Sequence, residues 1–170
     1  MAEPASSRVV WAGRYLTVTV EEWATSTYEI ARVHDGVGIV PITPDDDVLL
    51  VRQFRPPVRG DLTEIPAGLL DVEGEDALTC AERELFEETG FRHTGMEFLG
   101  GTYLAPGFSP VYMHLFLART QPEAEGSPEE GIELVRMPFA DAEAAARSGK
   151  IRNAFTALAL LLVAGRVSGR

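Results

Sequence analysis

One segment, from Asp76 to Thr89, constrains the fold more than any other, because a helix would separate its apolar and acidic residues onto two sides. One side carries the residues expected to pack on a sheet, namely Leu78, Ala81, Leu85 and Thr89. The opposite side carries three glutamates at i, i+3 and i+4, namely Glu84, Glu87 and Glu88. Asp76 is the expected N-cap, and Gly90 is expected to end the helix. The fold must therefore supply a sheet for the apolar side and a counter-charge for the acidic side.

The three glutamates would repel one another and destabilise an isolated helix. A hard divalent cation removes that cost, because Mg²⁺ and Mn²⁺ prefer carboxylate oxygens as ligands. Arg83 lies one turn before Glu87, so it can pair with that carboxylate and hold it in position. A glutamate-rich helix taken alone is more often a solvated acidic surface, and at this point that alternative stays open.

The chain as a whole is acidic, with a formal net charge of −11 over 170 residues. This charge repels nucleic acids and acidic membrane surfaces, so neither is an expected partner. The longest apolar run, 157–164, has eight residues, far fewer than the roughly 20 that a membrane-spanning helix needs. The single cysteine, Cys80, excludes an intrachain disulfide, and the first eight residues contain no apolar signal segment. We therefore expect a cytoplasmic protein.

The rest of the chain alternates between strand and helix patterns. The expected strands are, in order, Val9–Trp11, Tyr15–Val20, Tyr28–His34, Val37–Thr43, Val48–Arg55, Val111–Ala118 and Ile132–Met137. The stretch 60–75, rich in Gly and Asp, is expected to be a loop. Helices are expected over Phe139–Ser148 and Ala154–Ala164, the second capped by Asn153. This order predicts an α/β fold of the mixed α+β kind, with helices on both faces of a mixed sheet.

The stretch Gly68–Phe91 resembles the Nudix box, the signature of the Nudix hydrolase superfamily. The box runs glycine, spacer, glutamate, seven residues, then Arg-Glu-aliphatic-any-Glu-Glu-any-Gly-apolar, and this chain supplies Glu75, seven residues and Arg83–Phe91. Seven specified positions, each at a background of about one in twenty, match by chance roughly once per billion starting points. One departure is the spacer between Gly68 and Glu75, which has six residues instead of the usual five. An insertion in a loop leaves the helix unaltered.

The resemblance implies a Nudix-type α/β/α sandwich with a mixed sheet over residues 35–170. Residues 1–34 would form an N-terminal extension of antiparallel β-strands that dimerises. Carried over by position, the metal ligands are Glu84, Glu88, Glu87 and the carbonyl of Ala67. Glu75 and Arg83 would orient these ligands, and the implied cofactor is Mg²⁺ or Mn²⁺. The cations would neutralise the substrate diphosphate and acidify an attacking water.

Two further segments resemble the ADP-ribose pyrophosphatase branch of this superfamily. One is Val51–Arg55 followed by Glu64–Gly68, and its candidate substrate-binding residues are Arg52, Arg55 and Glu64. The fork of Arg55 could hold a phosphate. A solvent-facing side chain is the alternative for Arg52, Arg55 and Arg59. The other is Pro106, fifteen residues after Phe91, which this resemblance implies would bind substrate together with Gly107 and Phe108. A plain Pro-Gly turn is the alternative.

A late acidic stretch and the N-terminal strands complete the resemblance. Glu129–Glu133 resembles a mobile acidic loop of this branch that supplies the general base, and the candidates are Glu130 and then Glu129. The N-terminal strands of this branch commonly cross to a partner subunit, which predicts a homodimer. Tyr28, followed by Glu29, would stack on the adenine. Tyr28, Trp11 and Trp23 could equally be core or dimer-interface anchors.

The expected activity is Mg²⁺-dependent hydrolysis of the pyrophosphate bond of ADP-ribose to AMP and ribose 5-phosphate. The box reads only the diphosphate, so sugar nucleotides, FAD or NADH, and coenzyme A derivatives remain alternative substrates. A nucleotide-sensing Nudix module without catalysis is a second alternative. Such a module usually lacks part of the glutamate set and carries a DNA-binding domain, whereas here the set is complete and no basic recognition helix is evident.

Overall fold

The main sheet is built around β4 (Gly36–Ile42), a strand whose seven residues are all buried. The other strands of this sheet are β5 Asp47–Arg55, β6 Gly60–Glu64, β7 Ala67–Leu69, β8 His93–Tyr103, β9 Tyr112–Thr120 and β10 Glu133–Pro138. In the computed structural model, which describes residues 3–167, the strand order is β10-β5-β4-β9-β8, with β6 added to β5 and β7 to β4. Only the β4–β9 pair among these is parallel, so the sheet is mixed.

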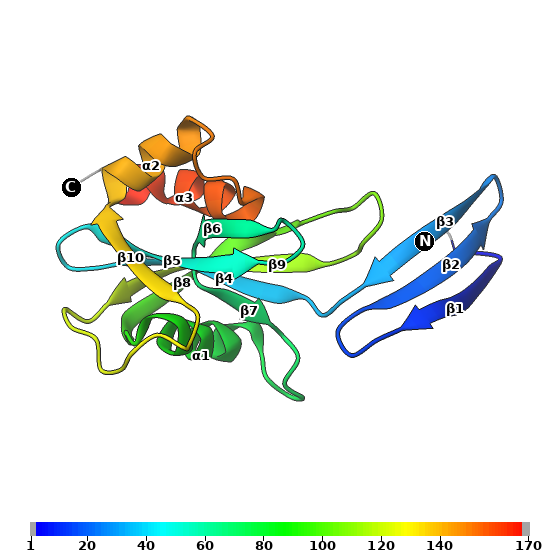
Figure 1. Ribbon diagram of the computed structural model, residues 1–170, viewed down its shortest axis with the longest axis horizontal. Coiled ribbons are helices and arrows are strands. Elements are labelled where there is room, and N and C mark those ends of the chain that lie inside the picture. Colours follow the sequence, from blue (N-terminus) through cyan, green and yellow to red (C-terminus); the bar gives the residue numbers. More distant parts are fainter. Residues whose placement is uncertain (1–2, 168–170) are drawn as a thin grey trace.

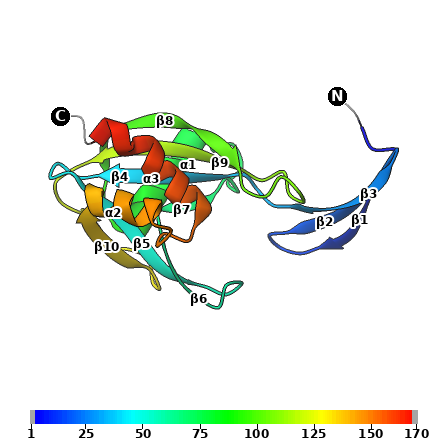
Figure 2. The same ribbon diagram turned by 90° about the horizontal axis from the view of Figure 1, so that it is seen from above.

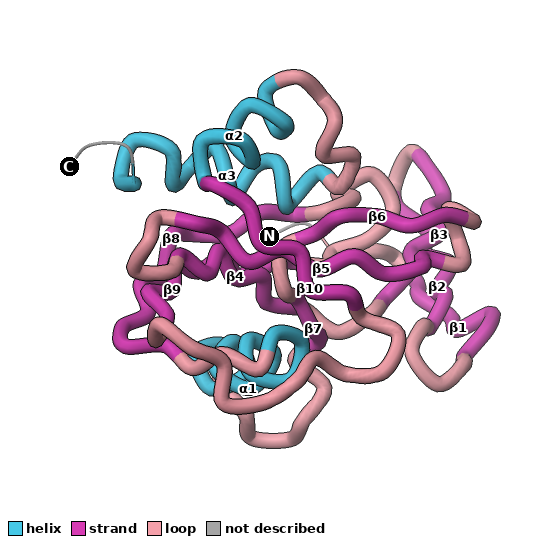
Figure 3. Tube along the Cα trace, turned by 60° about the vertical axis from the view of Figure 1, so that its left-hand side comes forward, coloured by secondary structure: helices cyan, strands magenta, loops and turns pink. Residues whose placement is uncertain are grey.

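Helices cover both faces of this sheet, as Figures 1 and 3 show. Helix α1 (Ala77–Thr89) lies on one face, and α2 (Phe139–Arg147) and α3 (Ala154–Val167) lie on the other. The core on the α1 side contains Val37, Ile39, Cys80, Ala81, Leu85, Phe116 and Ala118. The larger core on the other side joins residues of β4, β5 and β9 to both C-terminal helices. The sandwich with a mixed sheet that the sequence predicts is therefore confirmed.

Both ends of α1 are capped as expected. The side chain of Asp76 accepts a hydrogen bond of 2.8 Å from the Thr79 N–H, and Gly90 ends the helix with a φ of 75°. Gly90 is also a point of close approach, because a Cβ there would lie 2.3 Å from the carbonyl oxygen of Gly126. The Gly90 carbonyl in turn accepts hydrogen bonds from the N–H groups of Glu125 and Gly126. The end of α1 thereby anchors the acidic loop.

The structure corrects the expected loop at 60–75, because this stretch contains β6 and β7. Each pairs with a strand of the main sheet, and local composition does not encode such pairing. The first turn of α1 differs as well. Leu78, expected on the packed side, is 45% exposed, whereas Cys80 is fully buried. The packed face of the helix is therefore rotated toward Cys80.

The C-terminal helices begin where the sequence predicts. The Oδ1 atom of Asn153 accepts a hydrogen bond of 3.0 Å from the Thr156 N–H, so the predicted cap of α3 is confirmed. No bounds were predicted for β8, because its glycines interrupt the alternation. Its pairing with β9 shifts register near Gly95 and Gly100. Among residues 3–167, no helix combines the length and the apolar composition needed to cross a membrane.

Strands β1 (Ser6–Ala12), β2 (Thr17–Trp23) and β3 (Ser26–Arg32) form a separate antiparallel sheet that projects from the sandwich (Figures 1 and 2). A backbone hydrogen bond of 2.8 Å from the Ala31 N–H to the Phe108 carbonyl ties this sheet to the loop after β8. The boundary predicted at residue 34, between the N-terminal extension and the sandwich, falls in the connection between β3 and β4. The division into two units stays a prediction. Residues 1–2 and 168–170 of the two predicted segments lie outside the described residues.

Candidate active site

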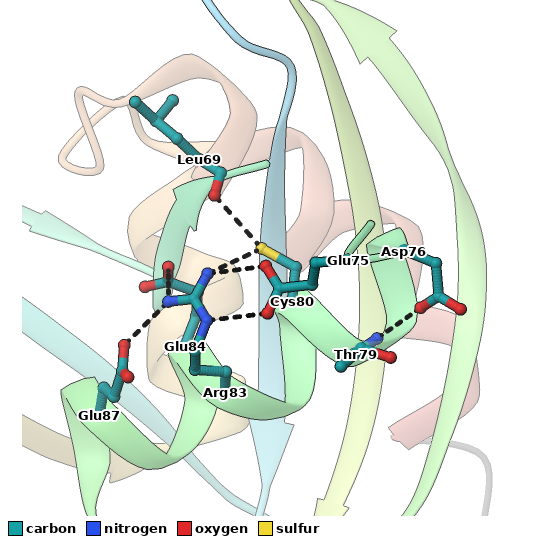
Figure 4. Close-up of polar contacts among 8 residues, drawn as sticks. All are labelled: Leu69, Glu75, Asp76, Thr79, Cys80, Arg83, Glu84 and Glu87. Atoms are coloured by element: carbon teal, nitrogen blue, oxygen red, sulfur yellow. Dashed lines mark hydrogen bonds and ion pairs between the residues drawn. The ribbon is translucent and has the colours of Figure 1, made fainter. Parts of the chain in front are cut away.

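Arg83 is the centre of a polar cluster on α1, as Figure 4 shows. Its Nε and Nη2 atoms each donate to Glu75 at 2.9 Å, and its Nη1 donates to Glu84 at 2.7 Å and to Glu87 at 2.9 Å. The hydrogen bonds with Glu75 are the main reason why the pKa of Arg83 is raised and that of Glu75 is lowered. One permanently charged guanidinium therefore holds three carboxylates in fixed positions.

Glu84 lies against the backbone of β7 at Gly68. A Cβ at Gly68 would lie 1.9 Å from the carboxyl carbon of Glu84, so only glycine leaves room for this side chain. The six-residue spacer after Gly68 ends in a surface turn, where Gly74 has a φ of 82° and open space around it. The extra spacer residue is thus accommodated away from the carboxylates.

Glu88 is only 6% exposed, although the sequence placed it on the acidic side of the helix. Its Oε2 accepts a hydrogen bond of 2.9 Å from the Ala67 N–H in β7. Burial raises the pKa of Glu88 to about 8, and burial is also the main cause that raises the pKa of Glu84. Carboxylates held in so poorly solvated a position favour a proton or a cation as partner.

The predicted metal ligands lie on two adjoining elements, α1 and β7, but they do not form a ready-made cage. Within residues 3–167, no three Asp, Glu, His or Cys side chains converge on one point as a metal site would require. Glu84 and Glu87 share the Nη1 atom of Arg83, while Glu88 is turned toward Ala67. The negative charge of Glu84 nevertheless contributes to the raised pKa of Glu88, which shows that the two carboxylates are close.

Arg55, at the end of β5, lies beside this cluster. Its Nε donates to Glu64 Oε2 at 3.0 Å, and its Nη2 makes a short contact with the same oxygen. Arg55 lowers and Glu64 raises the pKa of Glu88, so both lie near that carboxylate. Glu64 itself is 1% exposed, and its carboxylate accepts hydrogen bonds from Arg55 and Asn153. Arg52 lies on the opposite face of β5 and pairs with Glu133 at 3.4 Å, so of the two predicted arginines Arg55 is the one beside the cluster.

The acidic loop between β9 and β10 reaches the cluster through its backbone. The Glu129 N–H donates to the carbonyl of Glu87 at 3.0 Å, and the negative charge of Glu129 is one of the causes that raise the pKa of Glu84. Glu130, the residue preferred from the sequence, is exposed and one position further along this loop. In this conformation Glu129 is the loop glutamate whose charge is felt at the cluster.

A pocket of about 540 Å³ lies between β3 and the loop that follows β8. Four residues predicted to bind substrate line it, namely Tyr28, Pro106, Gly107 and Phe108. Glu29, also predicted, points to the other face of β3, because side chains alternate along a strand. The sequence reasoning missed six lining residues, namely Trp23, Ile30, Arg32, Tyr103, Ser109 and Pro110. The alternation that starts at Tyr28 would have indicated Ile30 and Arg32.

Glu21, 5% exposed, organises the β-sheet wall of this pocket. Its two carboxylate oxygens accept hydrogen bonds from Arg32 Nη2 at 2.7 Å and from Trp23 Nε1 at 3.2 Å. The rings of Trp23 and Tyr28 meet edge to face with their centroids 6.4 Å apart. The pocket therefore offers fixed aromatic surfaces and the guanidinium of Arg32 to a flat ligand.

The Cys80 thiol remains protonated at neutral pH. Burial, followed by the negative charge of Glu75, raises its pKa to about 12. Its Sγ contacts the Leu69 carbonyl and the Arg83 Nη2, each at 3.5 Å, so it fills space behind the cluster. A thiol that is buried and protonated in this way is not a nucleophile.

A family model for the NUDIX domain matches residues 32–158 of this chain. Among curated proteins, the methanol dehydrogenase activator of Bacillus methanolicus is 30% identical over 160 residues, which are 89% of this chain and 86% of that protein. The ADP-ribose pyrophosphatase of Bacillus subtilis is 29% identical with the same coverage. The GDP-mannose pyrophosphatase of Yersinia enterocolitica is 32% identical over 162 residues, 86% of this chain and 84% of that protein.

A solved structure supports the same relationship. The crystal structure of an ADP compounds hydrolase superposes with a TM-score of 0.80 at 28% sequence identity. The match covers 98% of this chain and 94% of that chain, so the projecting N-terminal sheet is included in the similarity.

The buried position of Glu88 predicts a pH-dependent stability in the presence of a chelator. The unfolded side chain titrates near its ordinary pKa of about 4.3, and the folded one at about 8. The stability that Glu88 contributes is therefore present below about pH 4 and is lost as the pH rises to about 8. Glu88→Gln, which keeps an acceptor for the Ala67 N–H, should raise Tm over the parent more at pH 8 than at pH 5, as measured by differential scanning calorimetry.

The control for this measurement is Glu123→Gln, which changes an exposed glutamate that has no side-chain partner among the described residues. If the difference in Tm between Glu88→Gln and the parent were the same at both pH values, Glu88 would not titrate in this range.

Proposed function

Because this chain belongs to the NUDIX domain family and is a Nudix hydrolase, we propose that it cleaves the pyrophosphate bond of ADP-ribose to AMP and ribose 5-phosphate. The observation that carries this proposal is the carboxylate cluster around Arg83, with the cationic Arg55 beside it. Such an arrangement suits a substrate with adjacent phosphates, because metal-bound carboxylates and an arginine fork together stabilise phosphoryl charge. The names of two similar proteins refer to ADP-ribose and to ADP compounds, which supports this choice among nucleoside diphosphates.

Mg²⁺ or Mn²⁺ is the proposed cofactor, and the donor set fits such a cation. Glu84, Glu87 and Glu88 offer hard oxygen ligands, and the carbonyl of Ala67 is proposed as a further one. Burial raises the pKa of Glu84 and Glu88, and a divalent cation would relieve this cost of keeping them ionised. When bound, Mg²⁺ supplies neutralisation of phosphoryl charge and a lowered pKa for a coordinated water.

The protein groups around the cluster have separate proposed roles. Arg83 and Glu75 orient the carboxylates, since Glu75 fixes one edge of the guanidinium and leaves Nη1 to Glu84 and Glu87. Arg55 would donate to a phosphate of the substrate from its exposed edge. Glu64 would act behind Arg55, because it is buried and both hydrogen bonds from Arg55 end on it.

The base of the substrate is proposed to bind in the aromatic pocket beside β3. Tyr28 and Phe108 offer rings for stacking, and the neighbouring Pro106 and Gly107 shape the same wall. A purine is favoured because its two fused rings match a pocket with several aromatic surfaces. The alternative substrate is GDP-mannose, since a protein named GDP-mannose pyrophosphatase is 32% identical to this chain.

A homodimer is proposed because β1 lacks a covering surface within one chain. All seven of its side chains are exposed, including Val9 at 61%, Val10 at 44% and Trp11 at 53%. Apolar residues on both faces of a strand favour a second layer of protein. The cytoplasm stays the proposed compartment, on the acidic charge and the single cysteine.

Activity assays with Mg²⁺ on ADP-ribose, GDP-mannose, FAD, NADH and coenzyme A should give the highest kcat/KM with ADP-ribose, and chromatography should identify AMP and ribose 5-phosphate. Glu84→Gln should lower kcat on the order of 10²–10³-fold while the fold is kept, and Glu82→Gln is the matched control on the same helix. Full turnover in excess EDTA would refute the metal site. A higher kcat/KM with GDP-mannose would move the substrate to the sugar nucleotides.

The loop glutamates can be separated by a pair of variants. Glu130 is proposed as the general base from the family pattern, and Glu129 is the second candidate because its charge acts on Glu84 in this conformation. If Glu130 is the base, Glu130→Gln should lower kcat about 10²–10⁴-fold with little change in KM, and Glu129→Gln is its control. The reverse result would assign the base to Glu129. If both stay within a few-fold of the parent, the loop supplies no base.

The dimer is tested on β1 itself. Val9→Glu should convert a dimer into a monomer at micromolar concentration in light scattering, because a charge would be buried in the interface. Ser7→Glu, on the same face of the same strand, is the matched control with a polar parent residue. A parent protein that is monomeric and fully active would remove the proposal.

A further inference from the structure

Asn153 lies at the start of α3, where both ends of its amide are engaged. Its Oδ1 caps the helix by accepting from the Thr156 N–H at 3.0 Å. Its Nδ2 donates to Glu64 Oε1 at 2.8 Å. The amide orientation is fixed by this pair of partners, because a backbone N–H needs an acceptor and a carboxylate needs a donor.

Glu64 is divided between two partners. Its Oε1 takes the Asn153 amide, and its Oε2 takes both the Nε and the Nη2 of Arg55. With 1% of its surface exposed, Glu64 has no solvent to replace a lost partner. The position of the carboxylate therefore sets the position of the Arg55 fork.

A second hydrogen bond closes the connection between α3 and the strand that carries Glu64. The N–H of Ile65, the next residue, donates to the buried Oγ1 of Thr156 at 3.1 Å. Asn153, Glu64, Ile65 and Thr156 thus form a closed ring of hydrogen bonds and covalent links. Such a ring has few ways to deform, so Glu64 is held from two sides.

Asparagine at position 153 supplies more hydrogen-bonding groups than a helix cap requires. Asp, Ser and Thr supply the same acceptor to a helix N-terminus. Asp has no donor, and the hydroxyl of Ser or Thr carries its proton on the capping oxygen itself. Asparagine adds a donor on a second atom, Nδ2, and here that donor meets the buried carboxylate behind Arg55. The residue therefore has a role besides capping.

We propose that Asn153 is a positioning residue for substrate phosphate, acting through Glu64 on Arg55. Glu64 fixes Nε and Nη2 of Arg55, which leaves Nη1 free of hydrogen bonds to the described residues on a side chain that is 37% exposed. Pinning one edge of the guanidinium aims the other at a ligand and removes rotamers that would have to be lost on binding. This inference rests on the proposed function, because the ligand is the diphosphate of its substrate.

The first test separates capping from positioning. Asn153→Ser and Asn153→Asp both keep an acceptor for the helix N-terminus, and both lack the Nδ2 atom that donates to Glu64. Each should raise KM about tenfold for the diphosphate that the parent hydrolyses best, with kcat changed far less. Ile151→Val, which removes a buried methylene-sized group from the same connection, is the control for a loss of Tm without a change at Glu64. An unchanged KM in both Asn153 variants would overturn the proposal.

A double-mutant cycle tests the route through Arg55. In an Arg55→Ala background, Asn153→Ser should cause no further rise in KM, because the group that it positions is absent. If Asn153→Ser raised KM by the same factor with and without Arg55, the two residues would act independently, and the proposal would be wrong. The cycle uses whichever diphosphate is turned over fastest, so an error in the choice of ADP-ribose leaves it intact.

A measurement on the free protein is independent of any activity. In ¹⁵N relaxation, the Nε–H of Arg55 should show a high order parameter in the parent and a clearly lower one in Asn153→Ser, and Arg55→Ala assigns the resonance by its loss. An unchanged order parameter would show that Asn153 does not hold Arg55, whatever substrate the enzyme uses. Absence of hydrolysis with every diphosphate, combined with a lowered order parameter, would overturn the proposed function and leave the positioning of Arg55 established.

Discussion

The contact of the Arg83 guanidinium with three carboxylates is the interaction around which the rest of the site is arranged. Glu75 comes from the loop before α1, while Glu84 and Glu87 come from the helix itself, so the guanidinium joins loop and helix into one unit. Like charges would otherwise drive these side chains apart. The backbone is adapted to the same cluster, because Gly68 in β7 leaves the space that the Glu84 carboxylate fills.

A second constraint is the burial of acidic groups beside α1. Burial raises the pKa of both Glu84 and Glu88, which means that folding without a cation places ionisable groups where their charged forms are costly. This cost arises beside Arg55, the arginine that we propose to bind phosphate. Such a conflict between stability and local chemistry is typical of functional sites. The positive charge of Arg55 offsets part of it at Glu88, and the carboxylate of Glu64 keeps that arginine in place.

The second half of the site belongs to the projecting N-terminal sheet and the loop after β8. The Ala31–Phe108 backbone bond joins them, and the aromatic pocket lies at this junction. Buried Glu21 ties Arg32 to Trp23 on the strand side, so this wall is organised by polar contacts much as the carboxylate cluster is organised by Arg83. The proposed function places diphosphate chemistry and recognition of the base on separate elements. Similar proteins are named for different nucleoside diphosphates.

The sequence by itself determined α1, its caps at Asp76 and Gly90 and the helical spacing of its glutamates, because helix periodicity and capping are local properties. It also indicated the sandwich and the aromatic and proline residues of the pocket. Only the tertiary structure decided which groups meet. It turned Cys80 inward, buried Glu88 against β7, built β6 and β7 from an expected loop, and set Asn153 against Glu64, 89 residues away in the chain. Strand pairing and desolvation depend on partners that are distant in sequence, and neither periodicity nor composition carries information about them.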